Sequence, residues 1–206
     1  MKPAWWDEAG LSLAARDATL ARIMRECGPG HPARREDPFQ ALARSIVGQQ
    51  ISVAAAQAVW SRVVARAGNV EPGRLSRMRI PTLRACGLSE RKAEYLKDLA
   101  GRFVSGDVDP SHWPDLSDDE LIAELTRVRG VGRWTAEMLL IFNLHRPDVF
   151  PVDDVGLLRG IARNYLQGST PTRSEALAIG ENWRPWRSLA TWYMWRCLDP
   201  LPVENR

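Results

Sequence analysis

A glycine hairpin between two predicted helices is the first segment of the sequence that could do chemistry. Residues 125–136 read LTRVRGVGRWTA. Gly130 and Gly132 can adopt positive φ angles and bring the backbone close to a ligand. The free N–H groups at the start of the next helix, which we expect over residues 133–144, attract an anion such as a phosphate. The segment therefore predicts a site that grips a phosphate.

A pair of carboxylates farther along the chain is the second such segment. Residues 149–154 read VFPVDD, and the next helix is expected over residues 155–166. Asp153 and Asp154 thus precede a helix N-terminus, where the helix dipole favours negative charge. From position alone, both could be N-caps and nothing more, or one could cap while the other projects into a cleft. Together with the hairpin, the pair suggests a protein that holds a nucleic-acid backbone and does chemistry beside it.

The spacing L-x-x-V-x-G-V-G-x-W-T-A in the hairpin resembles the helix-hairpin-helix of the DNA glycosylase superfamily. Three further blocks, at residues 37–53, 86–93 and 183–188, resemble family blocks and come in the family order. Four ordered blocks are far more specific than any one of them. The whole chain is similar to the alkylation-repair branch, the DNA-3-methyladenine glycosylase II family.

The resemblance implies an enzyme of base excision repair. Such an enzyme flips an alkylated purine of the 3-methyladenine type out of duplex DNA and hydrolyses its N-glycosidic bond, which leaves an abasic site. The resemblance makes Asp154 the catalytic carboxylate and Asp153 the cap or a support. Breaking the bond builds positive charge on the deoxyribose, and a fixed carboxylate stabilises that charge and can orient the attacking water. Because an N-alkylated purine is already cationic, no strong general acid is required.

The resemblance also assigns a base pocket, with Trp134, Met138, Val155 and Trp195 as its residues. Trp134 stands where bifunctional relatives have a catalytic lysine, which predicts a monofunctional hydrolase. The alternative for Trp134 is a core tryptophan at a helix start. Trp195 aligns with a pocket aromatic, whose ring would attract a cationic base by about 0.5 to 2 kcal/mol. Met138 and Val155 replace tyrosines of a known member, so this pocket should be less aromatic.

Residues of one loop and of the helix-hairpin-helix are expected to contact DNA: Gln49, Gln50, Gly130, Gly132, Arg133 and Thr135. Gly48-Gln49-Gln50 interrupts a helical pattern, so it should form a loop tip. In the family the residue at Gln50 is the wedge that fills the gap left by the flipped nucleotide, whereas the sequence alone would favour a solvated turn. At the hairpin, Gly130, Gly132 and Thr135 would donate to phosphate. Arg133 could equally be a solvated surface cation.

No cofactor is expected to be required. The resemblance implies at most a structural Na⁺ or K⁺ ion between the hairpin and a DNA phosphate, held by the main-chain oxygens of Thr126, Val128 and Val131. The three cysteines of the chain are too scattered for a disulfide framework or a zinc site. The region near the C-terminus also lacks the four closely spaced cysteines of the family members that carry an iron–sulfur cluster.

The composition is that of an ordinary globular protein with a mild positive charge. Of 206 residues, 45% are apolar, and the formal net charge is +3. Only Lys2, Lys92 and Lys97 are lysines, so no lysine lies near the hairpin in the sequence to form a Schiff base. The other cations are arginines, which suit phosphates, although a GC-rich genome would explain most of this bias. Because no apolar run is long enough for a signal peptide or a membrane span, we expect a cytoplasmic protein that binds no membrane. We also expect a monomer that associates with the nucleoid through its binding to duplex DNA.

Strand signals are nearly absent and helix start signals recur, so the sequence predicts an all-α fold. N-cap and capping-box patterns lie at residues 37–40, 117–120 and 172–175. By resemblance the chain is a single helix-hairpin-helix glycosylase domain, a two-lobed helical bundle with the DNA cleft between the lobes. We expect the central lobe at about residues 38–145 and the second lobe from the N-terminal segment with residues 146–206.

Two other functions compete with excision of alkylated purines. Helix-hairpin-helix motifs also serve as passive backbone clamps, so the chain could be a non-catalytic DNA-binding module. Asp154 and Trp195 discriminate against that function, because a passive clamp needs neither. A glycosylase for other damaged bases is the remaining alternative, which the missing hairpin lysine and cysteine cluster disfavour.

Overall fold

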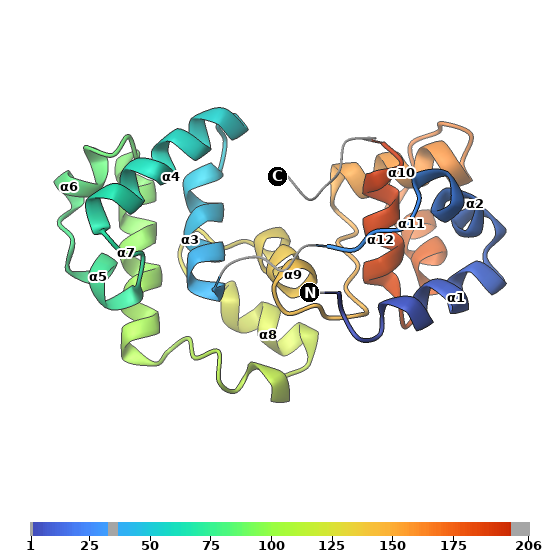
Figure 1. Cartoon of the computed structure of the whole chain (residues 1–206), viewed down its shortest axis with the longest axis horizontal. Helices are drawn as coiled ribbons and strands as arrows, with labels where there is room; N and C mark the ends of the chain where they lie inside the picture. Colours follow the sequence, from blue (N-terminus) through green and yellow to red (C-terminus); the bar gives the residue numbers. More distant parts are fainter. Residues whose placement is uncertain (1, 33–36, 199–206) are drawn as a thin grey trace. The chain divides into compact units, whose positions relative to one another are not determined.

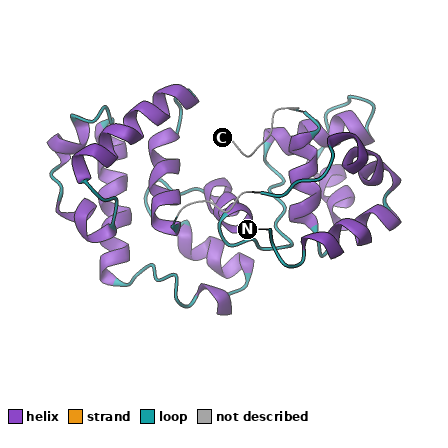
Figure 2. Cartoon of the chain, viewed as in Figure 1, coloured by secondary structure: helices purple, strands orange, loops and turns teal. Residues whose placement is uncertain are grey.

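The computed structural model describes residues 2–32 and 37–198, which form helices, turns and loops. Twelve α-helices and one short 3-10 helix lie in these residues, and no strand occurs among them (Figure 2). The prediction of an all-α fold is confirmed. No helix of this described part is long and apolar enough to cross a membrane.

The helices are joined by loops and short turns (Figure 1). The α-helices are α1 (Trp6–Arg16), α2 (Ala18–Cys27), α3 (Pro38–Gly48), α4 (Val53–Ala67), α5 (Pro72–Arg77), α6 (Ile80–Arg84), α7 (Glu90–Ser105), α8 (Asp118–Leu125), α9 (Arg133–Phe142), α10 (Val155–Tyr165), α11 (Arg173–Glu181) and α12 (Arg187–Arg196), with the 3-10 helix η1 at Trp113–Asp115. The helices predicted after the hairpin and after the aspartate pair are α9 and α10. Both begin at the predicted residues.

The chain divides into two compact units. Unit 1 consists of Met1–Arg34 and Leu140–Arg206, and unit 2 consists of Arg35–Leu139. The boundary falls inside α9, after Leu139, whereas the sequence placed it near residue 145. Unit 1 is therefore assembled from two segments that are far apart in the sequence.

Side-chain caps begin several helices where the sequence predicts them. The Asp37 carboxylate accepts two backbone N–H groups of α3, at 3.0 and 3.3 Å, and Pro38 occupies the first helical position. Ser117 and Thr172 each form a capping box with the glutamate three residues later. Each N-cap of this kind stabilises its helix by about 1 kcal/mol, because it satisfies a donor that has no intrahelical partner.

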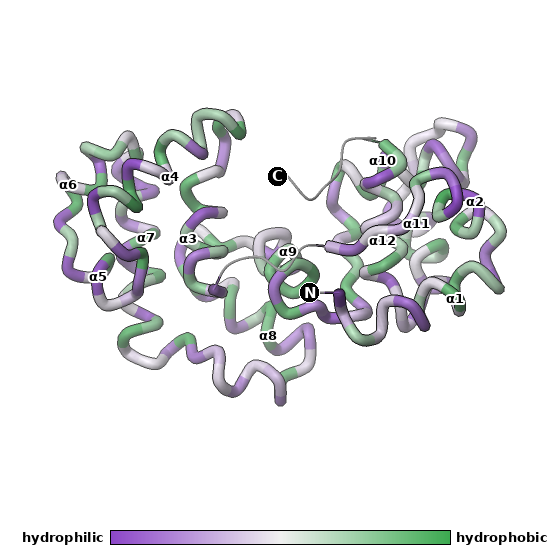
Figure 3. Tube along the Cα trace, in the orientation of Figure 1, coloured by the Kyte–Doolittle hydropathy of each residue, from purple (hydrophilic) through white to green (hydrophobic). Residues whose placement is uncertain are grey.

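The core of unit 2 lies around α7, which packs against α3, α5 and α6. Leu42 and Ile46 of α3 and Leu96 and Leu99 of α7 are all buried. Hydrophobic and hydrophilic residues alternate along these helices (Figure 3), as expected for helices with one buried face. Burying each large apolar side chain stabilises the fold by about 1.5 to 3 kcal/mol. This core holds α3 in place. The loop that follows α3 is the one that the sequence predicts to contact DNA.

The core of unit 1 lies around α12, which contacts α1, α2 and α10. Residues 188–194 of α12 are all buried, so this helix is enclosed rather than amphipathic. A glycine lets α10 approach it closely, since a Cβ at Gly160 would lie 2.8 Å from the carbonyl oxygen of Met194. The contact sets α10 against α12, and Asp154 at the start of α10 bonds Trp195 of α12.

Candidate active site and nucleic-acid interface

Asp154 is the N-cap of α10, and its carboxylate also binds the indole of Trp195. The Oδ1 atom accepts the backbone N–H of Leu157 (2.7 Å) and the Nε1–H of Trp195 (2.7 Å). An N-cap side chain bonds the N–H three residues later because that donor has no partner within the helix. The half-buried carboxylate is therefore held by donors from two elements, the start of α10 and the end of α12.

Asp153 was expected to be the cap of this helix or a support, and the first alternative is wrong, because the N-cap is Asp154. Asp153 is exposed, and its carboxylate pairs with Arg173 of α11. The helix begins at Val155, and only the residue directly before it has the geometry of an N-cap. Capping and the predicted chemistry therefore fall on the same residue, Asp154.

Two further residues hold Trp195 beside Asp154. The Trp195 ring stacks on Phe142, with 5.7 Å between the ring centroids. At Gly156 a Cβ would lie 2.9 Å from Trp195 Cδ1 and 3.1 Å from Asp154 Oδ1, so the site has no room for a side chain there. Gly156 was not among the site residues expected from the sequence. Its only signal is a glycine in the first turn of a helix, where it lowers helix stability.

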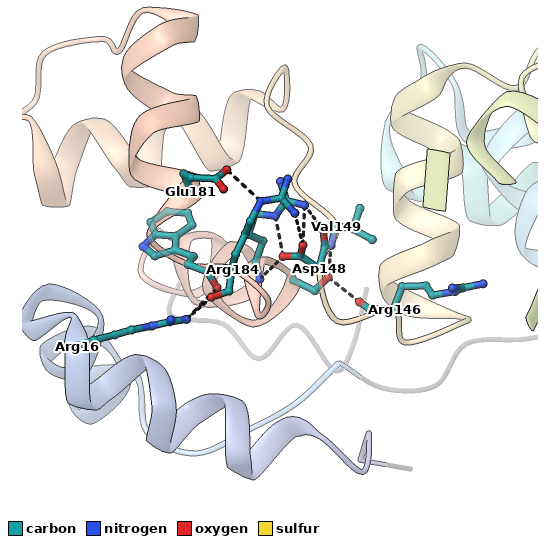
Figure 4. Close-up of polar contacts among 9 residues, drawn as sticks. Arg16, Arg146, Asp148, Val149, Glu181 and Arg184 are labelled. Atoms are coloured by element: carbon teal, nitrogen blue, oxygen red, sulfur yellow. Dashed lines mark hydrogen bonds and ion pairs between the residues drawn. The ribbon is translucent and has the colours of Figure 1, made fainter. Parts of the chain in front are cut away.

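The loop before Asp154 is fixed by a group of charged residues around Asp148 (Figure 4). The Asp148 carboxylate accepts hydrogen bonds from Arg184 (2.7 Å) and from two guanidinium nitrogens of Arg187 (2.7 and 2.8 Å). The Arg187 and Asp148 side chains are only 16% and 21% exposed, which shields the pair from water. Arg16 of α1 donates to the carbonyl oxygen of Arg184 (2.6 Å) and ties the N-terminal helix to this group.

The buried hydroxyl of Ser188 holds the same loop from the start of α12. The hydroxyl accepts the backbone N–H of Val149 (3.0 Å) and donates to the carbonyl oxygen of Arg146 (2.6 Å). The sequence block at residues 183–188 was recognised only by resemblance, and no role was assigned to it. In the structure this block anchors the segment that leads to Asp154.

The two hairpin glycines differ in conformation. Gly130 has a φ of 87°, in the left-handed region, and a Cβ there would lie 2.3 Å from Cδ2 of Tyr95 on α7. Gly132 does not use a positive φ, although the sequence allowed one. It is exposed, and a Cβ there would contact no more distant part of the chain within 4 Å. The fold therefore requires a glycine at residue 130, whereas Gly132 leaves open surface at the start of α9.

The first residues of α9 are mostly exposed. Arg133 forms ion pairs with Glu137 (3.0 Å) and Asp119 (3.5 Å), so it is a surface cation with acidic neighbours. Trp134 is 50% exposed, which excludes the alternative of a core tryptophan. Thr135 is buried, unlike the three exposed residues before it.

The predicted pocket residues belong to both units. Trp134 and half-buried Met138 lie on α9 in unit 2, whereas Val155 and Trp195 lie in unit 1. Val155 is 60% exposed and follows Asp154 directly. Within unit 1, Asp154, Val155 and Trp195 therefore form one group at the start of α10.

The predicted break after residue 48 is confirmed, because α3 ends at Gly48 and α4 begins at Val53. Gln50 is exposed and has a φ of 59°, which residues other than glycine rarely adopt. Gln49 is half-buried, and its Nε2 donates to the carbonyl oxygen of Gly130 (2.7 Å). The loop that carries Gln50 thus contacts the hairpin within unit 2.

Comparison with known sequences identifies relatives of this chain. A model of the HhH-GPD superfamily base excision DNA repair protein matches residues 43–185. The DNA-3-methyladenine glycosylase 1 of Schizosaccharomyces pombe is 34% identical over 196 residues, which cover 92% of this chain and 86% of the relative.

Solved structures resemble the chain over most of its length. A crystal structure of a DNA-3-methyladenine glycosidase from Bacillus halodurans has a TM-score of 0.85 and 34% identity, covering 91% of this chain and 87% of that one. The 3-methyladenine DNA glycosylase of Schizosaccharomyces pombe in complex with abasic DNA has a TM-score of 0.80 and 33% identity, covering 95% and 99%.

Proposed function

Because this chain belongs to the HhH-GPD superfamily of base excision DNA repair proteins, we propose that it is a monofunctional DNA glycosylase that excises alkylated purines from duplex DNA. The observation that carries the proposal is the Asp154 carboxylate, which Leu157 and Trp195 hold in place. A module that only clamped DNA would need no such carboxylate. The four ordered sequence blocks support the narrower designation as a DNA-3-methyladenine glycosylase II.

Asp154 supplies negative charge in the proposed reaction. The bond between C1′ of the deoxyribose and the nitrogen of the alkylated base breaks, and the base leaves with the electron pair. The sugar becomes an oxocarbenium-like cation, which the carboxylate stabilises. Water then adds its oxygen to C1′ and releases a proton, so the products are the free base and an abasic site. Because both N–H donors already hold Oδ1, the carboxylate reorients little as the charge develops.

The proposed enzyme does not cleave the DNA strand. Trp134 stands where bifunctional relatives have the lysine that forms a Schiff base. Lys92 and Lys97 each donate from Nζ to two backbone carbonyl oxygens, so both ammonium groups have structural partners. Water is therefore the proposed nucleophile, and the product is an intact strand with an abasic site.

The hairpin is proposed to hold the DNA backbone. Backbone N–H groups would donate to a phosphate at Gly130, Gly132 and Thr135, with added positive charge from Arg133. The open surface at Gly132 supports this role, because a phosphate can approach the backbone there. The proposed wedge is Gln50, at the exposed tip of the loop after α3.

A Na⁺ or K⁺ ion at the hairpin remains a proposal. Its ligands would be the main-chain oxygens of Thr126, Val128 and Val131. The Val128 oxygen accepts the N–H of Val131 (3.0 Å), which leaves it a second lone pair for a cation. Such an ion would add positive charge beside a bound phosphate.

Within unit 1, the flipped base is proposed to contact Val155 and Trp195 beside Asp154. The two pocket residues expected on α9, Trp134 and Met138, stay a prediction. The exposed ring of Trp134 suits a cationic alkylated purine, because the face of an electron-rich ring attracts positive charge. A neutral undamaged base would lose this attraction. The monomeric state and the nucleoid location expected from the sequence are part of the same proposal.

One assay tests the proposed function. The protein is incubated with methylated duplex DNA, and the released bases are identified by chromatography with mass spectrometry. Free alkylated purines together with abasic sites and uncleaved strands would support the proposal. Tight binding without release of any base would instead favour the non-catalytic DNA-binding module, and release of oxidised or mispaired bases alone would favour a different glycosylase class.

A further inference from the structure

Both lysines of α7 close the C-terminal end of another helix. Lys92 Nζ donates to the carbonyl oxygens of Val47 (2.8 Å) and Gln49 (2.6 Å), at the end of α3. Lys97 Nζ donates to those of Ser76 (2.6 Å) and Met78 (2.8 Å), at the end of α5. The last carbonyl groups of a helix have no partner within it, and an ammonium group with three donors suits two converging oxygens. It also complements the negative end of the helix dipole.

Only the Lys92 cap lies next to a loop that is expected to contact DNA. The carbonyl oxygen of Gln49, which Lys92 binds, belongs to the residue directly before Gln50, whose left-handed φ is unusual for a residue with a side chain. Burial lowers the pKa of the Lys92 ammonium group, because removal from water disfavours its charged form. An exposed loop residue in a rarely used conformation persists only where its surroundings hold it.

The hairpin is attached to the same face of α7. Tyr95, one turn after Lys92, packs on Gly130, whose carbonyl oxygen accepts the Gln49 side chain. The guanidinium groups of Arg91 and Arg129 each lie 5.7 Å from the centre of the Tyr95 ring. The face of α7 that carries Lys92 and Tyr95 therefore contacts both the loop after α3 and the hairpin, all within unit 2.

We propose that Lys92 is a positioning residue that sets the loop of Gln50 in register with the hairpin. This inference rests on the proposed function, in which the hairpin grips a phosphate and Gln50 enters the duplex. Lys92 itself touches neither base nor sugar, and it acts by holding the Gln49 carbonyl and the end of α3. Replacing its ammonium group should therefore weaken base flipping and leave the chemistry at Asp154 intact.

A double-mutant cycle tests whether Lys92 acts through Gln50. Single-turnover excision of an alkylated purine from a fully paired duplex is measured for Lys92→Met, Gln50→Ala and the double variant. Each single change should slow excision roughly tenfold. The excision rate of the double variant should lie within about twofold of that of Gln50→Ala, because the second change cannot remove an effect that the first has already removed. If the double variant were instead slowed about a hundredfold, the two residues would act independently and the proposal would be overturned.

Lys97→Met is the matched control, because it removes the same pair of contacts from the same helix at a different helix end. It should lower thermal stability as much as Lys92→Met while excision stays close to wild type. Lys92→Arg keeps the positive charge and the donors, so it should retain most of the activity even if Lys92→Met fails to fold. Equal loss of excision in the Lys92→Met and Lys97→Met variants would show a structural role only.

Amide hydrogen exchange tests the positioning without any reaction. Loss of the lysine cap should speed exchange at the end of α3, residues 45–49, in Lys92→Met, and at the end of α5, residues 74–78, in Lys97→Met. Unchanged exchange at residues 45–49 in Lys92→Met would overturn the role of Lys92, whether or not the protein releases bases. Absence of base release by the wild type would overturn the proposed function separately.

Discussion

At the scale of single residues, one carboxylate oxygen serves two purposes. Asp154 Oδ1 begins α10 through Leu157 and accepts the indole N–H of Trp195. Donors that are fixed by the fold hold a charge in place better than mobile water does, because they need not reorient when the sugar becomes cationic. The same contacts therefore link the stability of this helix to the proposed catalytic role of Asp154.

Asp154→Asn removes the charge and keeps the cap. Asparagine caps a helix as well as aspartate does, and its Oδ1 can accept the same two N–H groups. The variant should therefore fold and bind abasic-site DNA at least as tightly as wild type, while single-turnover excision falls at least ~100-fold. Excision near the wild-type rate would refute the catalytic assignment of Asp154.

Asp153→Asn is the control for this charge. It removes an ion pair with Arg173 that lies on the surface, and such pairs contribute less than about 1 kcal/mol. Thermal unfolding and excision should both stay close to wild type, in contrast to the neighbouring variant.

Gly156→Ala tests whether the fit around Trp195 matters. In an open helix position alanine would raise stability by about 1 kcal/mol. Here its Cβ would meet Trp195 and the Asp154 oxygen, so we expect a lower melting temperature, a changed tryptophan fluorescence spectrum and excision slowed by about tenfold. A higher melting temperature with unchanged excision would show that the indole moves aside without consequence.

At the scale of elements, the hairpin contains one glycine that the fold requires and one that is proposed to face the ligand. Gly130 is left-handed and packed by Tyr95, so its substitution would disturb the hairpin itself. Gly132 is exposed with open space around it, and a larger side chain there would block the approach to the backbone instead.

Gly132→Val should therefore keep the fold and lose DNA affinity. Losing a hydrogen bond to a charged phosphate costs about 1.5 to 3 kcal/mol, or tenfold or more in Kd. The loss should be similar for damaged and undamaged duplexes, and added salt should weaken the binding of both proteins. If a folded Gly132→Val variant bound abasic-site DNA as tightly as wild type, the hairpin would not be the anchor.

At the scale of the whole molecule, residues distant in sequence hold the loop of Asp154. Unit 1 joins the N-terminal segment to Leu140–Arg206, and Arg16 of α1 reaches the carbonyl oxygen of Arg184. Arg184 and Arg187 in turn bind Asp148, six residues before Asp154 in the chain. The position of the carboxylate thus depends on contacts between both segments of this unit.

Arg187→Met tests this dependence. The change removes two of the hydrogen bonds to the Asp148 carboxylate in a mostly buried setting, which should cost about 1 to 3 kcal/mol in the free energy of unfolding and slow excision. Arg184→Met is the comparison, because the Arg184 side chain is 48% exposed and should contribute less. Thermal unfolding and single-turnover excision rates are measured for both variants. Arg187→Met should lose more stability and more activity than Arg184→Met, and equal losses would contradict this expectation.

Local patterns in the sequence determined the elements of this protein. The caps at Asp37, Ser117 and Thr172, the break after Gly48 and the hairpin between α8 and α9 all depend on residues a few positions apart. Such interactions are set by backbone geometry within one turn or loop, so they can be predicted without knowledge of the fold.

Only the tertiary structure decided which residues act together. Trp195 lies 41 residues after Asp154 and was predicted to line a base pocket; that its N–H also holds the carboxylate is seen only in the structure. The cap role falls on Asp154 and not on Asp153, because the helix begins at Val155 and the residue directly before it has the N-cap geometry. The places of Gly156, Asp148 and Lys92 come from helices that pack across long stretches of chain. Contacts of this kind depend on the distance and angle between packed helices, which the order of residues along one helix does not specify.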